Sequence, residues 1–109
     1  MKNFRNIKEI HSACRKCKSC NLSTSRNNVV VAKGNPEAKM FIIGEAPGEK
    51  EDITGFPFVG RAGKMLDAVL ESVDIDPLND CYITNIVKCR PPENRRPSSS
   101  EIKSCISWL

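Results

Sequence analysis

Apolar residues recur along this chain with two different spacings, and each spacing predicts a different kind of element. Steps of three and four residues predict a helix within residues 2–14 and a second helix over residues 65–73. Short apolar or β-branched runs predict strands at residues 29–31, 39–44 and 81–87. The run at 39–44 is typical of a strand that is buried on both faces of a parallel sheet.

Two segments rich in glycine and proline separate these elements. Residues 45–60 contain two prolines and three glycines, so we expect a long irregular loop there. Residues 90–97 form a second expected loop, after which Ser98 and Glu101 make a capping box that starts a last helix. The order strand, helix, strand, helix predicts an α/β fold with a parallel sheet. In such folds the loop at the carboxyl end of a buried strand commonly carries the chemistry.

Length and composition indicate one globular domain. The chain has 109 residues, of which 39% are hydrophobic and 28% are charged. Its apolar runs are far shorter than a membrane span and its start has no secretory signal pattern, so we expect a cytoplasmic protein. The net charge of +4 is compatible with a polyanionic partner. Because the sequence ends inside the last predicted helix after two central strands, we expect residues 1–109 to be the N-terminal part of one longer domain.

Six cysteines are the next informative feature. In a cytoplasmic protein, clustered cysteines bind metal more often than they form disulfides. One close pair and one distant pair could supply four thiolates to a single zinc ion or to an iron–sulfur cluster, namely Cys17, Cys20, Cys89 and Cys105. The spacing alone does not choose between the two metals. We interpret Cys14 and Cys81, which stand at apolar positions, as small buried hydrophobic residues.

The loop that follows the strand at 39–44 combines glycines, carboxylates and an aromatic side chain. Glycines let a ligand approach the backbone closely, and the carboxylate of Glu51 could orient a water molecule. An aromatic residue such as Phe58 could stack on a flat ring. Each of these residues alone is a weak signal, because acidic pairs are commonly solvated and phenylalanines are commonly core residues.

Together these motifs closely resemble the family 4 uracil-DNA glycosylases, the iron–sulfur branch of the uracil-DNA glycosylase superfamily. The resemblance covers nearly the whole chain in order. It rests on Cys17-x2-Cys20-x-Leu22, Arg26-x-Asn28-Val29-Val30, Gly44-Glu45-Ala46-Pro47-Gly48-x2-Glu51-Asp52, Gly55-x-Pro57-Phe58-Val59-Gly60-Arg61-Ala62-Gly63, Tyr82-Ile83-Thr84-Asn85-Ile86-Val87-Lys88-Cys89-Arg90-Pro91-Pro92, Asn94-Arg95, Pro97, Glu101 and Cys105.

The resemblance implies a fold, a cofactor and a reaction. The fold is a three-layer α/β/α arrangement around a parallel sheet, here with about two core strands. The cofactor is a structural four-iron, four-sulfur (4Fe–4S) cluster held by Cys17, Cys20, Cys89 and Cys105. The reaction is excision of uracil from DNA by hydrolysis of the N-glycosidic bond, after the base is flipped out of the stack. We expect a monomer that acts on uracil-containing DNA.

The resemblance also assigns roles to individual residues. Phe58 stacks on the flipped ring, and the loop residues Gly44, Ala46, Pro47 and Gly48 bind the base. Asn85 reads the base edge, since a carboxamide can donate to O4 of uracil and accept from N3–H, whereas cytosine presents the opposite polarity. Glu51 is our first choice for the carboxylate that orients water, and Glu45 is our second. Phosphate contacts are expected from Lys88, Arg90, Arg95 and Arg96.

The sequence departs from the family in one respect. Family members have a later His-Pro-Ser motif, whereas the single histidine here is His11, which we interpret as a helix-surface residue. Three alternatives therefore stay open. The protein could act on another deaminated base such as hypoxanthine, it could be a non-catalytic zinc or iron–sulfur module that binds nucleic acid, or a second polypeptide could complete the domain.

Overall fold

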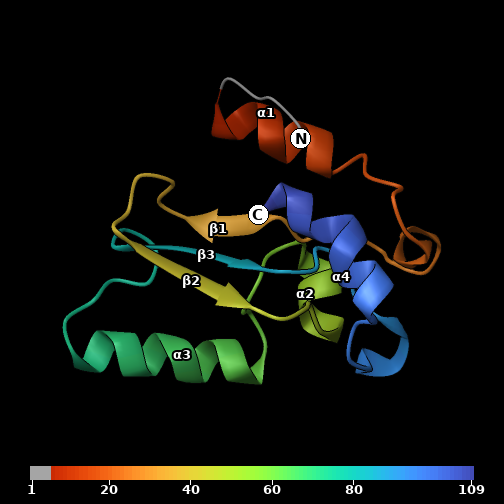
Figure 1. Ribbon diagram of the computed structural model, residues 1–109. Helices are drawn as coiled ribbons and strands as arrows, with labels where there is room; N and C mark the ends of the chain where they lie inside the picture. The colour runs from red at the N-terminus through yellow and green to blue at the C-terminus, as the bar shows by residue number, and fades with distance from the viewer. Residues whose placement is uncertain (1–5) are drawn as a thin grey trace.

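The computed structural model describes residues 6–109, which form a small sheet with helices on both faces (Figure 1). The helices and strands, in chain order, are α1 Ile7–Cys14, β1 Ala32–Gly34, β2 Met40–Gly44, α2 Glu49–Thr54, α3 Arg61–Ser72, β3 Cys81–Asn85 and α4 Ser99–Cys105. Short 3-10 turns occur at Asn21–Thr24, Pro92–Asn94 and Ile106–Trp108. Among the described helices, none has the length and apolar character needed to cross a membrane.

The sheet is mixed, with the strand order β1-β3-β2. β2 and β3 are parallel, as predicted, and their register places Gly44 opposite Asn85 at the carboxyl ends of both strands. β1 runs antiparallel to β3, so the sheet is mixed and the predicted parallel arrangement holds for β2 and β3. Residues 35–39 between β1 and β2 are too few for a crossover connection, and they reverse the chain direction instead.

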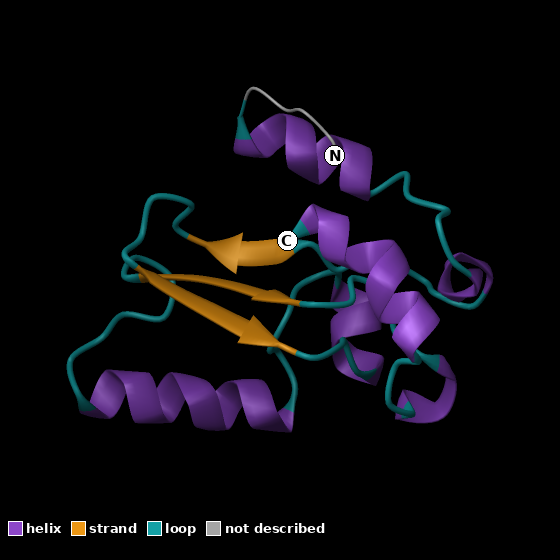
Figure 2. Ribbon diagram, in the orientation of Figure 1, coloured by secondary structure: helices purple, strands orange, loops and turns teal. Residues whose placement is uncertain are grey.

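Side chains of β3 alternate between the two faces of the sheet. Cys81 and Ile83 are fully buried and pack with Leu70 of α3 in one core cluster. On the other face, the hydroxyl of Tyr82 lies 2.7 Å from Nε2 of His11 in α1. Figure 2 accordingly shows α1 and α3 on opposite sides of the sheet. His11 is therefore a contact between helix and sheet, and its interpretation as a helix-surface residue is wrong.

Three of the predicted elements differ from the structure. The strand expected at residues 29–31 begins at Ala32, although Val30 and Val31 are buried. β2 is not buried on both faces: Phe41 is 48% exposed and Ile43 is 46% exposed, and these two side chains share one face of the strand. The segment 45–60, expected to be irregular throughout, contains the two-turn helix α2.

A second core cluster lies beyond the carboxyl ends of β2 and β3. It consists of Leu22, Val87, Cys89 and Cys105, and Trp108 packs against it. The chain therefore brings two of the expected metal ligands together with the 3-10 turn at Asn21–Thr24, which directly follows Cys20. Long-range apolar packing thus joins the N-terminal segment to α4.

The capping box predicted for the last helix is confirmed. The hydroxyl of Ser98 accepts the backbone N–H of Glu101, and the Glu101 carboxylate accepts the backbone N–H of Ser98. Arg95 also donates two hydrogen bonds of 2.8 and 2.7 Å to this buried carboxylate. The Arg95 hydrogen bonds lower the pKa of Glu101 from 4.5 to about 2. Because Cys105 lies one turn further along α4, these contacts also set its position.

Glu101→Gln should destabilise the fold in a pH-dependent way. Since the pKa of Glu101 is lower in the folded protein than in the unfolded chain, its contribution is complete above pH 4.5 and is lost as the pH falls toward about 2. At pH 7 we expect the variant to lose about 2 kcal/mol of unfolding free energy. Urea unfolding of both proteins between pH 2 and pH 7 measures this difference. A difference that does not shrink toward pH 2 would contradict the assignment.

Candidate active site

The loop after β2 is shaped by one carboxylate, that of Glu51 at the start of α2. One of its oxygens, Oε1, accepts the backbone N–H of Gly48 at 2.9 Å. The other oxygen, Oε2, accepts the backbone N–H groups of Val59 at 3.0 Å and Gly60 at 2.7 Å. Glu51 therefore joins the two ends of the glycine-rich segment across α2, and this is a structural function that the sequence did not reveal.

Phe58 stands at the turn that this loop makes before α3. Its backbone has φ 53°, a left-handed conformation that is unfavourable for a side chain other than glycine. The ammonium of Lys33 donates to the Phe58 carbonyl at 3.1 Å. Gly63 lies so close to the same carbonyl that a β-carbon at position 63 would overlap it. Backbone strain of this kind persists where the surrounding structure enforces it, and it is common at ligand sites.

Asn85 and Phe58 meet at Gly44. A β-carbon at Gly44 would lie 2.3 Å from Oδ1 of Asn85 and 2.5 Å from Cζ of Phe58, so only glycine fits between them. Asn85 is 3% exposed. A small cavity of about 90 Å3 opens here, and its lining includes Ala46, Glu51, Phe58 and Asn85. The structure therefore brings together the predicted stacking ring, the predicted base-reading amide and the first-choice carboxylate.

Glu45, the second-choice carboxylate, faces outward. Its carboxylate forms an ion pair of 3.2 Å with Arg96, and both side chains are substantially exposed. Pro47 is buried, and the Gly48 N–H is already bonded to Glu51. Of the four loop residues expected to bind the base, Ala46 lines the cavity, and Gly44 lies against two residues that line it, Asn85 and Phe58.

All four predicted metal ligands surround one cavity at the second core cluster. Cys17 and Cys20 come from the segment before the turn at Asn21–Thr24, Cys89 from the loop after β3 and Cys105 from the end of α4. Among the described residues, no three histidine, cysteine, aspartate or glutamate side chains already converge on one point in the manner of a single-ion site. The sulfurs thus border a common space without meeting at its centre.

Hydrogen-bond donors point at three of these sulfurs. Arg26 donates to Sγ of Cys89 at 3.1 Å, the backbone N–H of Lys88 donates to Sγ of Cys105 at 3.1 Å, and the Trp108 indole donates to Sγ of Cys17 at 3.3 Å. N–H donors of this kind stabilise thiolates and sulfur-ligated metals. Burial raises the pKa of Cys105 to about 11 and also raises that of Cys89. A metal that bound these thiols would therefore release their protons.

The two remaining cysteines, Cys14 and Cys81, are buried in different parts of the fold. Cys14 is fully buried at the end of α1, and burial raises its pKa to about 12. Cys81 is fully buried in the core between the sheet and α3. Neither lines the cavity of the other four, as expected for small buried hydrophobic residues.

The four basic residues expected to contact phosphate differ in their exposure. The Arg96 side chain is 88% exposed and Arg95 is 43% exposed, while Arg90 donates from Nε to Asn94 at 2.7 Å in the same loop. Lys88 is only 3% exposed, and its ammonium bonds inside the protein. Burial lowers its pKa. The structure therefore places three arginines at the surface and removes Lys88 from the phosphate-facing set.

Sequence reasoning missed two supporting residues of the loop. Asp52 is 1% exposed, and its carboxylate accepts the backbone N–H groups of Asn27 at 2.9 Å and Asn28 at 3.1 Å. The second is Lys33, which holds the Phe58 carbonyl. Both contacts join positions about 25 residues apart, so no local pattern predicts them. The adjacent carboxylates of Glu51 and Asp52 are the one local signal in the sequence, and such acidic pairs are more commonly solvated.

Gly44→Ala should disturb the cavity through steric overlap with Asn85 and Phe58. Overpacking of this kind costs about 1–3 kcal/mol of unfolding free energy, which chemical denaturation measures. The double variant Gly44→Ala/Phe58→Ala removes the ring from the overlap, so its loss should be smaller than the sum of the two single losses. Additive losses would show that the two residues do not meet as described.

Sequence comparison finds several type-4 uracil-DNA glycosylases that are similar to this chain. It is 47% identical to the type-4 uracil-DNA glycosylase of Saccharolobus solfataricus over 104 residues, which are 95% of this chain and 48% of that protein. It is 44% identical to the type-4 uracil-DNA glycosylase of Archaeoglobus fulgidus over 103 residues, which are 94% of this chain and 49% of that protein. The corresponding protein of Thermotoga maritima is 50% identical over 95 residues, 87% of this chain and 49% of its own length.

The chain thus spans about half the length of the curated relatives it matches. A family model described as "Uracil DNA glycosylase superfamily" matches residues 31–109, which include both strands of the parallel pair, the loop between them and α4. On this match, the chain belongs to the uracil-DNA glycosylase superfamily.

Proposed function

We propose that this chain is the base-recognition part of a DNA repair glycosylase that excises uracil by hydrolysis of its N-glycosidic bond. The observation that carries the proposal is the convergence of the Asn85 amide and the Phe58 ring on Gly44 in one small cavity. An enzyme that acts on a base must take it out of the stack and bind it in such a pocket. The names of the type-4 relatives support the same substrate.

The chemistry of the cavity suits uracil. An amide buried as deeply as that of Asn85 keeps one orientation, so it can donate to O4 and accept from N3–H at the same time. Cytosine would place a donor against a donor and an acceptor against an acceptor, and it would leave buried polar groups unpaired. The Phe58 ring supplies the flat surface on which the base would stack.

For the hydrolysis itself, we assign the water-orienting carboxylate to Glu51, with Glu45 as the second choice. Glu51 lines the cavity, and its three backbone hydrogen bonds fix the carboxylate in one position. A fixed carboxylate can orient the attacking water and stabilise the positive charge that develops on the sugar. Glu45 stands at the carboxyl end of β2, beside the surface arginines.

DNA would approach over the loop after β3. Arg90, Arg95 and Arg96 belong to this loop, and the exposed guanidinium of Arg96 is the most accessible of the three. Guanidinium groups at the surface suit phosphate contacts, which position the DNA without reading its sequence. Action on cellular DNA would place the protein in the cytoplasm, and we expect it to act as a monomer.

We further propose that Cys17, Cys20, Cys89 and Cys105 hold a 4Fe–4S cluster of structural function. Such a cluster binds each thiolate through a different iron, so its ligands surround a space, whereas the ligands of one zinc converge on a point. That the four cysteines border one cavity supports a shared metal centre, and the resemblance to the type-4 enzymes favours the cluster over zinc. When bound, the cluster would tie the N-terminal segment to the loop after β3 and to α4.

Asn85→Ala should remove the preference for uracil. We expect its affinity for a single-stranded oligonucleotide with one uracil to fall about tenfold, through two lost hydrogen bonds, while its affinity for the cytosine oligonucleotide stays unchanged. Fluorescence anisotropy at fixed salt measures both affinities. Asn79→Ala, which truncates an exposed asparagine just before the opposite end of β3, is the matched control. Equal binding of uracil and cytosine strands by the unaltered protein would overturn the proposed function.

Substitutions of cysteine should separate ligands from core residues. After anaerobic purification we expect about four irons per chain, with visible absorption near 400 nm, as for other clusters of this type. Cys20→Ala should lose most of this iron, whereas Cys14→Ala should keep it, because Cys14 lies outside the cavity that the four ligands line. Bound zinc in place of iron, or equal iron loss in both variants, would contradict the cluster assignment.

A further inference from the structure

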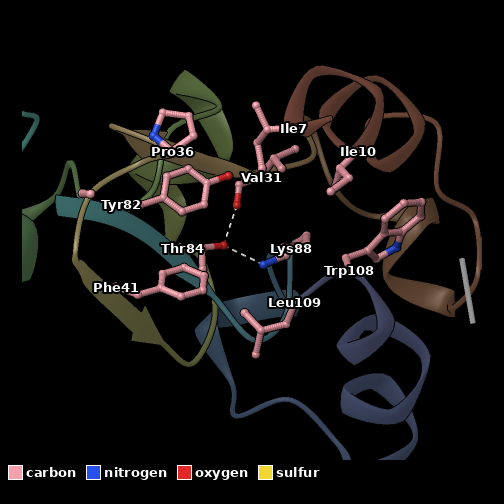
Figure 3. Close-up of a pocket in the computed structure, with 11 residues that line it drawn as sticks. Ile7, Ile10, Val31, Pro36, Phe41, Tyr82, Thr84, Lys88, Trp108 and Leu109 are labelled. Carbon is pink, nitrogen blue, oxygen red and sulfur yellow. Dashed lines mark hydrogen bonds between the residues drawn. The ribbon is translucent and has the colours of Figure 1, made fainter. Parts of the chain in front are cut away.

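Lys88 is a buried lysine whose ammonium reaches back toward the end of β3. Its Nζ donates to Oγ1 of Thr84 at 2.6 Å and also to the backbone carbonyl of Asn85. Thr84 in turn donates to the carbonyl of Val31 at 2.6 Å, and Figure 3 shows this line of contacts from Lys88 through Thr84 to Val31. Both groups that accept hydrogen bonds from the ammonium, the Thr84 hydroxyl and the Asn85 carbonyl, are uncharged.

Burying an ammonium among neutral partners is costly, because the charge loses its hydration without gaining a carboxylate. A residue kept at such a cost needs a function that a hydrophobic side chain of the same length would not provide. Lys88 borders a cavity of about 260 Å3 whose lining is otherwise mainly apolar, so a methionine would fit this environment better than a lysine. Lys88 also lines the cysteine cavity, so its charge has one function at that site if anionic sulfur groups are held there, and a second function in the groups that accept its hydrogen bonds.

One of the groups that accept these hydrogen bonds is the carbonyl of the base-reading residue. Asn85 is the last residue of β3 paired with β2, and the chain leaves the sheet directly after it. On that side, Ile86 and Val87 are fixed by N–H bonds to the carbonyls of Gly44 and Glu45. The Asn85 carbonyl accepts from Nζ of Lys88 and, at 3.4 Å, from the hydroxyl of Thr84. This carbonyl and the Ile86 N–H belong to one planar peptide group, which Gly44 thus holds at one end and Lys88 at the other, next to the Cα from which the Asn85 carboxamide extends.

The main chain of Lys88 is fixed in turn by the cysteine cavity. Its backbone N–H donates to Sγ of Cys105 at 3.1 Å, and its carbonyl accepts the backbone N–H of Val30 at 2.7 Å. The residue thus spans the distance between the sulfur site and the base-recognition site. Its main chain belongs to the first site, and its side chain supports the second.

We propose that Lys88 is a positioning residue for base recognition, whose ammonium fixes the Asn85 carbonyl and so holds the carboxamide in the orientation that selects uracil over cytosine. The inference rests on the proposed function. It assigns Lys88 a position inside the protein in place of a contact with DNA phosphate.

Lys88→Met tests this, because methionine keeps the length of the side chain and removes its donors. We expect the preference for the uracil oligonucleotide over the cytosine oligonucleotide to fall about tenfold, as for one lost hydrogen bond to a charged group, while binding of the cytosine strand stays within about twofold. Lys103→Met, on the exposed side of α4, removes the same charge and is the matched control. Iron content should stay unchanged in both variants, since the N–H donated to Cys105 belongs to the main chain.

The outcomes separate the two proposals. If the unaltered protein shows no preference for uracil, the proposed function fails. If it shows the preference and Lys88→Met keeps it, the inference fails and Lys88 is only a structural residue. A loss of affinity for both strands alike, in Lys88→Met and in Lys103→Met, would instead indicate a general charge effect and overturn the inference.

Thr84→Val provides a second test that does not depend on the folding of Lys88→Met. Valine keeps the shape of threonine and removes its hydroxyl. In the unaltered protein this hydroxyl and the Asn85 carbonyl both accept hydrogen bonds from the Lys88 ammonium. We expect the side-chain amide signals of Asn85 in a 15N–1H NMR spectrum to shift or broaden, and the preference for uracil to fall. Unchanged Asn85 amide signals together with an unchanged preference would overturn the inference.

Discussion

The parallel pairing of β2 with β3 is the constraint on which both candidate sites depend. Its register sets Gly44 beside Asn85, and it leaves the carboxyl ends of the two strands at one edge of the sheet. From that edge one strand continues into the loop that carries Glu51 and Phe58, and the other continues toward Cys89. A one-residue slip would turn the Asn85 side chain to the opposite face and separate it from the Phe58 ring.

Charged side chains give the irregular segments their shape. Glu51 and Asp52 accept backbone N–H groups from three separate parts of the chain, and Lys33 donates to the carbonyl of Phe58. Backbone groups outside helices and strands must find partners elsewhere, and here side chains provide them. These hydrogen bonds fix the backbone of the loop around the cavity, in addition to the apolar packing of Ala46 and Phe58. They also mean that the acidic pair of the recognition loop serves its folding at least as directly as its chemistry.

Sequence patterns predicted the features that depend on neighbouring residues. The helical spacing around Leu66 and Leu70, the β-branched run of β3 and the capping box at Ser98 each give a local signal, and the structure contains all three. β1 was misplaced because a three-residue strand is defined by its partner, β3, some 50 residues later in the chain. α2 was missed because Gly48 and Gly55 were interpreted as breakers of the segment, whereas they lie immediately outside its two ends.

The candidate sites show the same division between features that have a local sequence signal and features that depend on long-range contacts. The four cysteines were identified from their spacing and motif context, and they do surround one cavity. The Asn85 and Phe58 pair was identified from a resemblance, and the structure brings the two side chains together. The burial of Lys88 was not predicted, because a lysine within a run of basic residues looks like a surface charge. Only the fold reveals that its side chain turns inward to Thr84.

The exposed apolar side chains of β2 have a consequence for the behaviour of this polypeptide in solution. Within residues 6–109 the outer edge of β2 has no neighbouring strand, and Met40, Phe41 and Ile43 are each more than one third exposed. An edge strand with unpaired backbone groups and apolar side chains is a template for pairing with another chain. Concentrated preparations of these 109 residues should therefore tend to self-associate and precipitate, and dilute conditions will favour the dispersed species.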